Sequence, residues 1–391
     1  MIERLAIVVL AMSALTGAVR PEDDFRPTPE EQRRLELMSR PEQWFLQALA
    51  GPREVIDGQR LDPKQQYYLE ERRRRTPEQV QRGLATFLDP KARVATRDRL
   101  TREWALFTKV TAPMSKVEDR KIDGRGAPIP IRIYTPNLDG DEPLPLLVYF
   151  HGGGWLYSGI EAADRFARLV ANEAEAIVVS VDYRLAPEHL WPASNDDGED
   201  AFLWARANAS SLGSEPDMVA VGGDSAGGHI SLNISQRQIA AKRPTPAYQL
   251  LYYTSSDFAT SDESYRLFQH GYGLDETFRS FMIATVFPGE LLQKSAKELN
   301  GANLAGMPAT IAVSAGFDML RDSSRRLTER LTKAGVPATY LNYPTLAHGF
   351  LQWSAVVPDA ERASVDTARL FGAAVRSRVA LLRQQSRGKH E

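Results

Sequence analysis

A serine flanked by glycines is the residue of this chain with the clearest capacity for chemistry. Ser225 lies in the pentapeptide G-D-S-A-G (residues 223–227), directly after the apolar run 218–221. A serine hydroxyl is a weak nucleophile unless a base removes its proton and hydrogen-bond donors stabilise the oxyanion that forms. A G-x-S-x-G sequence between a strand and a helix is typical of a sharp turn that exposes such a serine. We therefore expect Ser225 to act as a nucleophile in acyl transfer. A glycine-rich turn with an incidental serine is the alternative.

A second glycine-rich segment could supply the stabilising donors. The sequence H-G-G-G at residues 151–154 directly follows the apolar run 146–150, so it should lie at the end of another buried strand. Glycine lets the backbone approach a ligand without a side chain in the way. We expect the N–H groups of Gly152 and Gly153, together with that of Ala226 after the nucleophile, to form an oxyanion hole.

The chain has six histidines, and their order along the sequence selects the base. In the arrangement that accompanies a G-x-S-x-G turn, the nucleophile comes first, then the acid, then the histidine. His348 fits this order, because it lies in A-H-G-F just past the apolar run 339–343. His151 is expected to hold the glycine-rich segment in place. We assign no catalytic role to the remaining histidines, which are His189, His229, His270 and His390.

Asp318 is the best-placed acid. It follows the apolar run 310–314 and precedes His348, so it could orient the imidazole and stabilise its charged form. Asp322, one helical turn further on, is the second choice, and it could equally serve as a negative charge at a helix N-terminus. Asp257 is the third choice.

The elements that would position these residues begin near residue 115. Strands buried on both faces and separated by helices form a mostly parallel sheet with helices on both sides, so the fold class is α/β. The apolar runs predict strands at residues 129–134, 146–150, 176–181, 218–222, 248–253, 310–314 and 339–343, and the amphipathic segments predict helices near 164–172, 196–208, 228–241 and 323–334.

Residues 20–114 are predicted to be helical instead. T-P-E-E at 28–31 and T-P-E-Q at 76–79 are typical helix starts, with a capping threonine, then proline, then a residue that completes a capping box. The basic run 72–75 is interpreted as a solvated helix face with local ion pairs, in preference to a nucleic-acid patch. Residues 256–304 interrupt the later strand–helix rhythm, and an insertion of this length is typical of a lid or cap.

Composition narrows the remaining possibilities. The 391 residues are 43% hydrophobic and 25% charged, with a net charge of -2, so neither a nucleic-acid partner nor binding to an acidic membrane surface is expected. The absence of cysteine excludes disulfides, thiolate zinc sites and a cysteine nucleophile.

The apolar stretch at residues 5–19 is too short for a stable membrane span. It is typical of a secretory signal cleaved near Ala18, and a packed N-terminal helix is the alternative. We favour export to the periplasm or the medium over a cytoplasmic location.

Together these segments resemble the hormone-sensitive-lipase-like carboxylesterases of the α/β-hydrolase superfamily. The resemblance covers about residues 114–370. Its departures are Met319, where the family usually has proline after the acid, and His229, where an asparagine commonly follows the double glycine. A third departure is the segment before Arg20 with the long helical lead to Met114, which exceeds what the family's N-terminal cap normally needs. The matching residues are H-G-G-G-W at 151–155, D-Y-R-L-A-P-E-H at 182–189, G-D-S-A-G-G at 223–228, and Asp318 and His348 in their surroundings.

The resemblance implies an α/β-hydrolase catalytic domain at residues 115–391, with a helical cap from residues 20–114 and the insertion 256–304. It implies a Ser225–Asp318–His348 triad that hydrolyses small-molecule carboxylic esters of short to medium acyl chains through an acyl-enzyme. No cofactor and no metal are implied, residues 182–189 would support the site, and members often pair as homodimers. An amidase, a deacetylase or a true lipase on the same machinery, and a ligand-binding homologue without turnover, are the alternatives.

Overall fold

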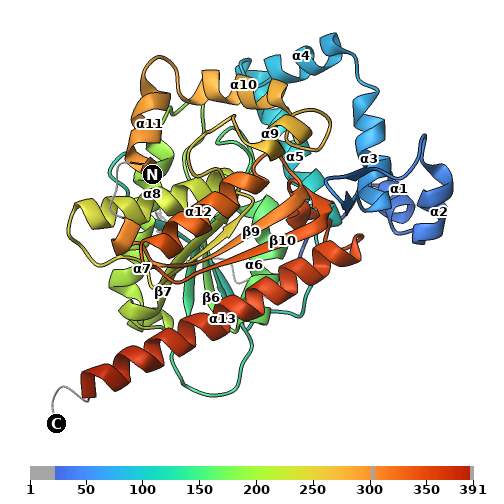
Figure 1. Ribbon diagram of the computed structural model, residues 1–391. Helices are drawn as coiled ribbons and strands as arrows, with labels where there is room; N and C mark the ends of the chain where they lie inside the picture. Colours follow the sequence, from blue (N-terminus) through green and yellow to red (C-terminus); the bar gives the residue numbers. More distant parts are fainter. Residues whose placement is uncertain (1–22, 301–303, 388–391) are drawn as a thin grey trace, which may run out of the picture.

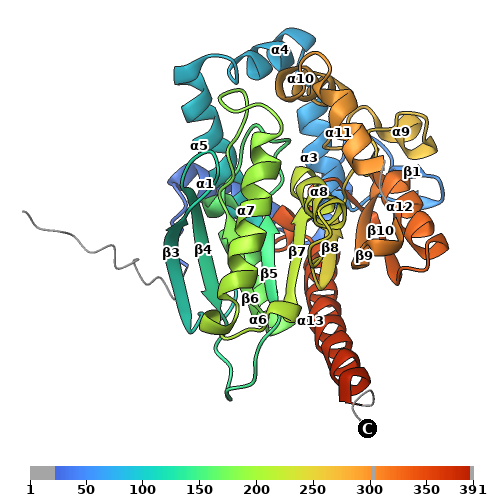
Figure 2. The same ribbon diagram turned by 90° about the vertical axis from the view of Figure 1, so that its left-hand side faces the viewer.

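The computed structural model describes residues 23–300 and 304–387 of the chain. The expected secretory signal at residues 1–19 and His390 lie outside the described residues. An eight-stranded sheet with the order β10-β9-β8-β7-β5-β6-β4-β3 forms the centre of the molecule (Figures 1 and 2). Its strands are β3 (Lys116–Ile122), β4 (Ile129–Thr135), β5 (Leu146–Phe150), β6 (Ile177–Val181), β7 (Val219–Asp224), β8 (Tyr248–Tyr252), β9 (Ala309–Phe317) and β10 (Ala338–Ala347).

The sheet is mostly parallel, as the sequence predicts. Strands β6, β5, β7, β8, β9 and β10 pair in parallel, whereas β4 runs antiparallel to β6 and β3 antiparallel to β4. Every predicted strand is present, with shifts of a few residues at its ends. Strand β3 was not predicted, because only Val117 and Ile122 of its seven residues are buried and the rest are largely charged. Charged side chains are common on edge strands, where they discourage pairing with other chains.

Helices cover both faces of this sheet. One face packs against α6 (Ile160–Ala174) and α13 (Pro358–Arg387), and the other against α7 (Ala193–Asn208), α8 (Ala226–Ala240) and α12 (Arg321–Lys333). Helix α13 was not predicted from the sequence. It lies along α6, and its last turns project beyond the body of the molecule in Figures 1 and 2.

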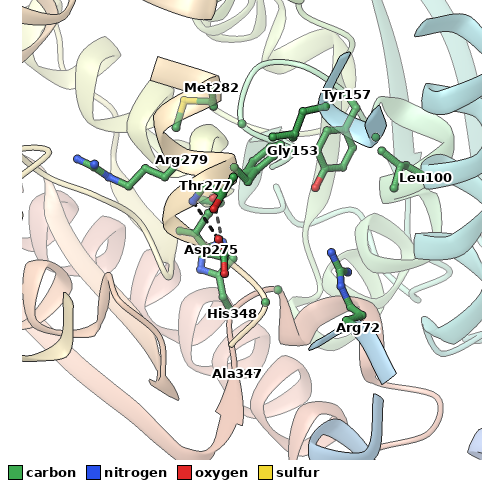
Figure 3. A pocket seen from close by; sticks show the side chains of 18 of the residues that line it. Arg72, Leu100, Gly153, Tyr157, Asp275, Thr277, Arg279, Met282, Ala347 and His348 are labelled. Atoms are coloured by element: carbon green, nitrogen blue, oxygen red, sulfur yellow. Dashed lines mark hydrogen bonds between the residues drawn. The ribbon is translucent and has the colours of Figure 1, made fainter. Parts of the chain in front are cut away.

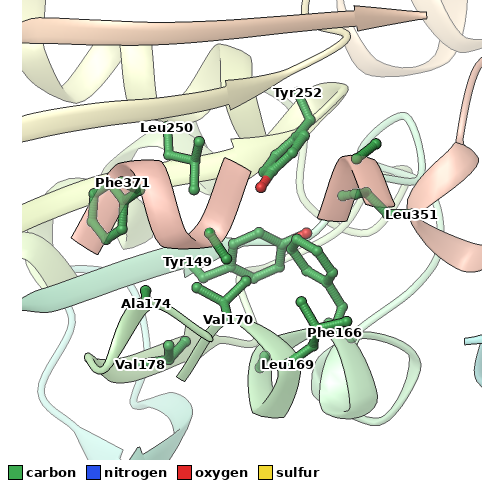
Figure 4. Packing of buried hydrophobic residues seen from close by; sticks show 14 of the residues in the cluster. Tyr149, Phe166, Leu169, Val170, Ala174, Val178, Leu250, Tyr252, Leu351 and Phe371 are labelled. Carbon is green, nitrogen blue, oxygen red and sulfur yellow. The ribbon is translucent and has the colours of Figure 1, made fainter. Parts of the chain in front are cut away.

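The core on the first face joins the central strands to α6 and α13. Figure 4 shows Tyr149 of β5 and Leu250 of β8 packed over Phe166 and Val170 of α6, with Phe371 of α13 closing the cluster. Phe371 has no exposed surface. Burial of a side chain of this size contributes about 1.5–3 kcal/mol to stability, so α13 is an integral part of the fold.

The N-terminal segment is helical with one short hairpin. Both expected helix starts are confirmed, since Thr28 and Thr76 form capping boxes with Glu31 and Gln79. The hairpin has only two residues in each strand and was not predicted. The elements of this segment are α1 (Pro29–Met38), α2 (Glu42–Ala48), β1 (Val55–Ile56), β2 (Gln59–Arg60), α3 (Pro63–Arg73), α4 (Pro77–Ala85) and α5 (Pro90–Phe107).

The insertion at residues 256–304 contributes α9 (Glu263–Phe268), α10 (Glu276–Val286) and α11 (Leu291–Asn300). Helices α4 and α10 lie beside each other at the top of Figures 1 and 2. The ring centroid of Phe87, two residues after α4, is 6.2 Å from that of Phe281 in α10. Two segments far apart in the sequence therefore meet on one side of the molecule. Among the described residues, no helix combines the length and the apolar character needed to span a membrane.

The first turn of helix α8 packs directly against the backbone at the end of β5. A Cβ atom on Gly227 would overlap the carbonyl oxygen of Phe150, and a Cβ atom on Gly223 would meet the same oxygen and the backbone of Gly227. Only glycine permits this approach.

We predict that Gly227→Ala lowers the free energy of unfolding by about 3 kcal/mol, because the added methyl group can be accommodated only by moving backbone. Urea denaturation monitored by circular dichroism measures the change. Gly83→Ala is the matched control: a Cβ atom on Gly83, which lies in α4, would meet no heavy atom within 4 Å, so this change should stabilise the protein by about 0.5–1 kcal/mol. Equal stability of the Gly227→Ala variant and the parent protein would contradict the close approach.

Candidate active site

Ser225 occupies a sharp turn between β7 and α8. Its backbone has φ 52° and ψ -114°, a conformation that L-residues rarely adopt and that costs on the order of 1–3 kcal/mol. Two hydrogen bonds hold it there: the Ser225 N–H donates to the carbonyl of Tyr252 at 2.9 Å, and the Thr254 hydroxyl donates to the carbonyl of Ser225 at 2.8 Å. The turn places the Ser225 hydroxyl at the carboxyl end of the sheet.

The structure brings the three residues of the expected triad together. Nε2 of His348 lies 3.1 Å from Oγ of Ser225, and Nδ1 of His348 lies 2.7 Å from Oδ2 of Asp318. A carboxylate only accepts hydrogen bonds, so Nδ1 carries the imidazole proton and Nε2 is free to accept the proton of the serine hydroxyl. The three residues directly follow β7, β9 and β10, which are separate in sequence, and they meet at the carboxyl end of the parallel strands.

Asp318, and neither alternative acid, lies beside His348. Its side chain has no exposed surface, and its other oxygen accepts the N–H of Leu320 at 2.9 Å, which fixes the orientation of the carboxylate. Asp322 accepts the N–H of Ser264 at 2.8 Å. Asp257 pairs with Arg326, also at 2.8 Å.

The glycine-rich loop departs from the prediction at Gly152. Its N–H donates to Oδ1 of Asp224 at 2.7 Å, and Gly152 does not line the cavity above Ser225, whereas Gly153, Gly154 and Ala226 do. The prediction that Gly152 offers its N–H to an oxyanion is therefore wrong for this arrangement. The physical reason is a carboxylate 72 residues away in sequence, which reaches the loop only in the folded chain.

Asp224 is a site residue that the sequence reasoning missed. Besides the Gly152 N–H, its carboxylate accepts the hydroxyls of Tyr149 at 2.6 Å and Tyr253 at 3.3 Å. Burial raises the pKa of Asp224 above its ordinary value, and these hydrogen bonds act against that increase. Asp224 thus connects the strand that carries the nucleophile to the loop beside it. The sequence signal that could have identified Asp224 is an acidic residue at the first variable position of G-x-S-x-G, at the end of a buried strand.

His151 holds the same loop from the other side, as expected. Its buried ring stacks on Tyr183 with centroids 4.2 Å apart, and Nδ1 lies 2.8 Å from the carbonyl of Gly152. The Tyr183 hydroxyl donates to the His151 carbonyl at 2.7 Å. Burial lowers the pKa of His151 to about 4, so the ring is neutral at neutral pH. Through Tyr183, the segment 182–189 therefore supports the glycine-rich loop, as the resemblance implies.

Helix α3 supports the loop that carries His348, a role that the sequence reasoning also missed. Oε1 of Gln65 accepts the N–H of Ala347 at 2.8 Å, and the Asp62 N–H donates to the carbonyl of Thr345 at the same distance. The residue directly before His348 is therefore held by a helix from the N-terminal segment. No local sequence pattern marks a contact between residues 282 positions apart.

A cavity of about 760 Å³ opens above the serine and histidine (Figure 3). Residues of α3, α4, α5 and α10 line its walls, so the N-terminal segment and the insertion enclose the site together. His229 borders the cavity but is buried, with Nε2 3.3 Å from the Ser295 hydroxyl, and burial lowers its pKa to about 3. Within the described part of the chain, no group of three or more histidines or carboxylates is arranged to hold a metal ion.

A protein-family model and several known enzymes are similar to this chain. A family model described as alpha/beta hydrolase fold matches residues 147–352. The carboxylesterase NlhH of Mycobacterium tuberculosis is 38% identical over 258 residues, which are 64% of this chain and 81% of that enzyme. The carboxylic ester hydrolase LipN of the same organism is 36% identical over 313 residues, covering 77% of this chain and 80% of LipN.

Solved structures agree with these relatives. The ester-hydrolase EH1AB1 from the metagenome of Lake Arreo, solved with a derivative of bipyridine phosphonate, superposes with a TM-score of 0.71 at 29% identity, over 89% of this chain and 99% of that one. An esterase of Pyrobaculum calidifontis gives a TM-score of 0.67 at 30% identity, over 72% and 93% of the two chains.

Proposed function

Since the chain belongs to the hormone-sensitive-lipase-like carboxylesterases of the α/β-hydrolase superfamily and is a carboxylic ester hydrolase, we propose that Ser225, His348 and Asp318 perform the hydrolysis as a catalytic triad. The observation that carries this proposal is the continuous pair of hydrogen bonds from the serine hydroxyl through the imidazole to the carboxylate. Ser225 and His348 line the cavity, where an ester can reach them.

In this mechanism the Ser225 hydroxyl oxygen attacks the ester carbonyl while Nε2 of His348 takes its proton. Asp318 keeps the imidazole in the required tautomer and stabilises the imidazolium that forms. His348 then gives the proton to the departing alcohol, leaving an acyl group on Ser225. A water molecule activated by the same histidine attacks this acyl-enzyme, and the acid product leaves with Ser225 restored.

We assign the oxyanion hole to the N–H groups of Gly153, Gly154 and Ala226. Gly153 and Gly154 have positive φ angles of 104° and 60°, which turn this part of the loop away from the path that Gly152 follows. Ala226 is the first residue of α8, so its N–H lacks a partner within the helix and lies at the positive end of the helix dipole. Each such donor is worth about 3 kcal/mol to the transition state.

We predict that Ser225→Ala abolishes ester hydrolysis, with a loss of turnover on the order of 10⁶-fold, and leaves the thermal midpoint nearly unchanged. Hydrolysis of 4-nitrophenyl butyrate and differential scanning fluorimetry measure the two quantities. A fluorophosphonate probe should add its mass to the parent protein and not to the variant. Labelling of the variant, or substantial remaining turnover, would remove Ser225 from this role.

Asp318→Asn should lower turnover on the order of 10⁴-fold, by analogy with serine proteases, because the amide no longer selects the productive imidazole tautomer. Asp322→Asn is the matched control: Asp322 bonds to the backbone of Ser264 and should be dispensable for turnover. Steady-state kinetics of both variants on one ester decide the matter. Greater damage from the Asp322 substitution would show that the acid is assigned wrongly.

We also propose a preference for short to medium acyl chains, because the cavity has a volume of about 760 Å³ and residues of α4 and α10 form part of its wall. Turnover of 4-nitrophenyl esters from acetyl to palmitoyl should peak at or below about eight carbons, an order-of-magnitude expectation from the size of ordinary ligand cavities. A maximum at palmitoyl would identify a true lipase. Faster cleavage of the corresponding anilides than of the esters would identify an amidase.

We also propose that the protein pairs into homodimers, which the family resemblance supports, and that it is exported from the cytoplasm, which the apolar segment at residues 5–19 supports.

A further inference from the structure

Four arginines line the side of the cavity that the N-terminal segment forms: Arg72, Arg73, Arg75 and Arg99. Within the described part of the chain, Arg72 and Arg75 have no carboxylate within salt-bridge distance, although both belong to the cavity wall. Five arginines line the cavity, and the other three pair with carboxylates: Arg73 with Glu54, Arg99 with Glu103 and Arg279 with Glu276.

Arg72 lies in a cluster with an excess of positive charge. Its Nη1 is 3.4 Å from the hydroxyl of Tyr68, and that hydroxyl donates to the carboxylate of Glu103 at 2.5 Å. Glu103 also pairs with Arg34 at 3.1 Å and with Arg99 at 3.4 Å. Glu103 therefore pairs directly with two guanidinium groups and reaches the third, that of Arg72, only through the Tyr68 hydroxyl. An arginine remains charged at any physiological pH, so the cluster carries positive charge that no described side chain neutralises.

Tyr157 adds a second donor at the same place. Its ring is packed among the aromatic rings of Phe87, Trp104 and Phe278. Figure 3 shows its hydroxyl and the guanidinium of Arg72 pointing toward one another across the cavity. No hydrogen-bond partner of this hydroxyl is found among residues 23–300 and 304–387. Burial raises the pKa of Tyr157 to about 12, so the hydroxyl keeps its proton at neutral pH.

Two features indicate that this pair faces a ligand. The exposed part of the Arg72 side chain borders the same cavity as Ser225 and His348. Neither Arg72 nor the Tyr157 hydroxyl has a carboxylate partner among the described residues, so both can donate to an anion that enters the cavity. The planar fork of a guanidinium matches the two oxygens of a carboxylate, and a nearby hydroxyl can donate to either oxygen.

We propose that Arg72 and Tyr157 form an anion subsite of the ester-binding cavity, which takes esters that carry a carboxylate group several bonds from the scissile carbonyl. This inference rests on the proposed role of Ser225, because the substrate must reach the serine with its ester group and Arg72 with its carboxylate. The carboxylate belongs either to the acyl part or to the alcohol part of the ester.

The test compares anionic and neutral esters of equal carbon number. For the acyl side, 4-nitrophenyl half-esters of dicarboxylic acids from glutarate to suberate are paired with the neutral 4-nitrophenyl alkanoates. For the alcohol side, 4-acetoxybenzoate is paired with 4-methylphenyl acetate. The quantity measured is the ratio of kcat/KM for the anionic ester to kcat/KM for its neutral partner.

Arg72→Gln should lower this ratio by about tenfold or more in the arm that matches the true substrate, as expected for the loss of a charge-assisted hydrogen bond. Tyr157→Phe should lower it in the same arm by a smaller factor. Hydrolysis of the neutral esters should persist in both variants, which shows that they are folded and that the serine machinery is intact.

Arg74→Gln is the matched control for net charge. Arg74 is two residues from Arg72, but its guanidinium pairs with Glu71 at 2.7 Å and does not line the cavity. This change should leave the ratio unaltered. A ratio that stays within about twofold of the parent value in both arms after Arg72→Gln, or that falls equally after Arg74→Gln, would overturn the subsite. Absence of turnover on the neutral esters in the parent protein would instead overturn the proposed function.

Discussion

The carbonyl oxygen of Phe150 rests against the backbone of Gly227, and this contact sets the distance between the two segments that meet at the site. Strand β5 delivers the glycine-rich loop, and the turn from β7 to α8 delivers Ser225. A methyl group at the junction would push these segments apart. The positions of the nucleophile and of the glycine-rich loop therefore both depend on this contact, which is possible only because Gly227 has no side chain.

The remaining parts of the site are held to this junction by buried polar bonds. Asp224 receives donors from the loop and from two tyrosines, so a displacement of β7 would break several hydrogen bonds together. The strained backbone of Ser225 is stabilised by neighbouring backbone and hydroxyl groups. His348 and Asp318 come from strands on the other side of β7, and helix α3 holds the histidine loop through Gln65. The active site is thus assembled from contacts that span the whole chain.

Local patterns were sufficient to predict seven of the eight strands of the large sheet, the capped helix starts and the three residues that lie together. Each depends on a short stretch: an apolar run, a threonine before proline, or a serine between glycines. The features that were missed depend on distant partners. Strand β3 is charged because it lies at an edge, and α13 buries Phe371 against elements from much earlier in the chain. The N–H of Gly152 is taken up by a carboxylate that arrives with β7, which no local pattern indicates.

The basic run at residues 72–75 also depends on distant parts of the chain, which its local sequence does not indicate. Its interpretation as a solvated face with local ion pairs holds for Arg74, which pairs with Glu71. Arg72 faces a cavity instead, and that cavity exists only after α5 and α10 have packed against the sheet. Sequence spacing shows which residues share a helix face, but the nature of the space in front of that face is a property of the whole fold.

Helix α3 both steadies the histidine loop and lines the cavity, yet it lies well before residue 147, where the similarity to the family model begins. The sheet supplies the reactive groups, and the N-terminal helices form one wall of the space in front of them. A chain cut back to residues 147–352 would retain Ser225 but lose Gln65, which holds the histidine loop, together with that wall.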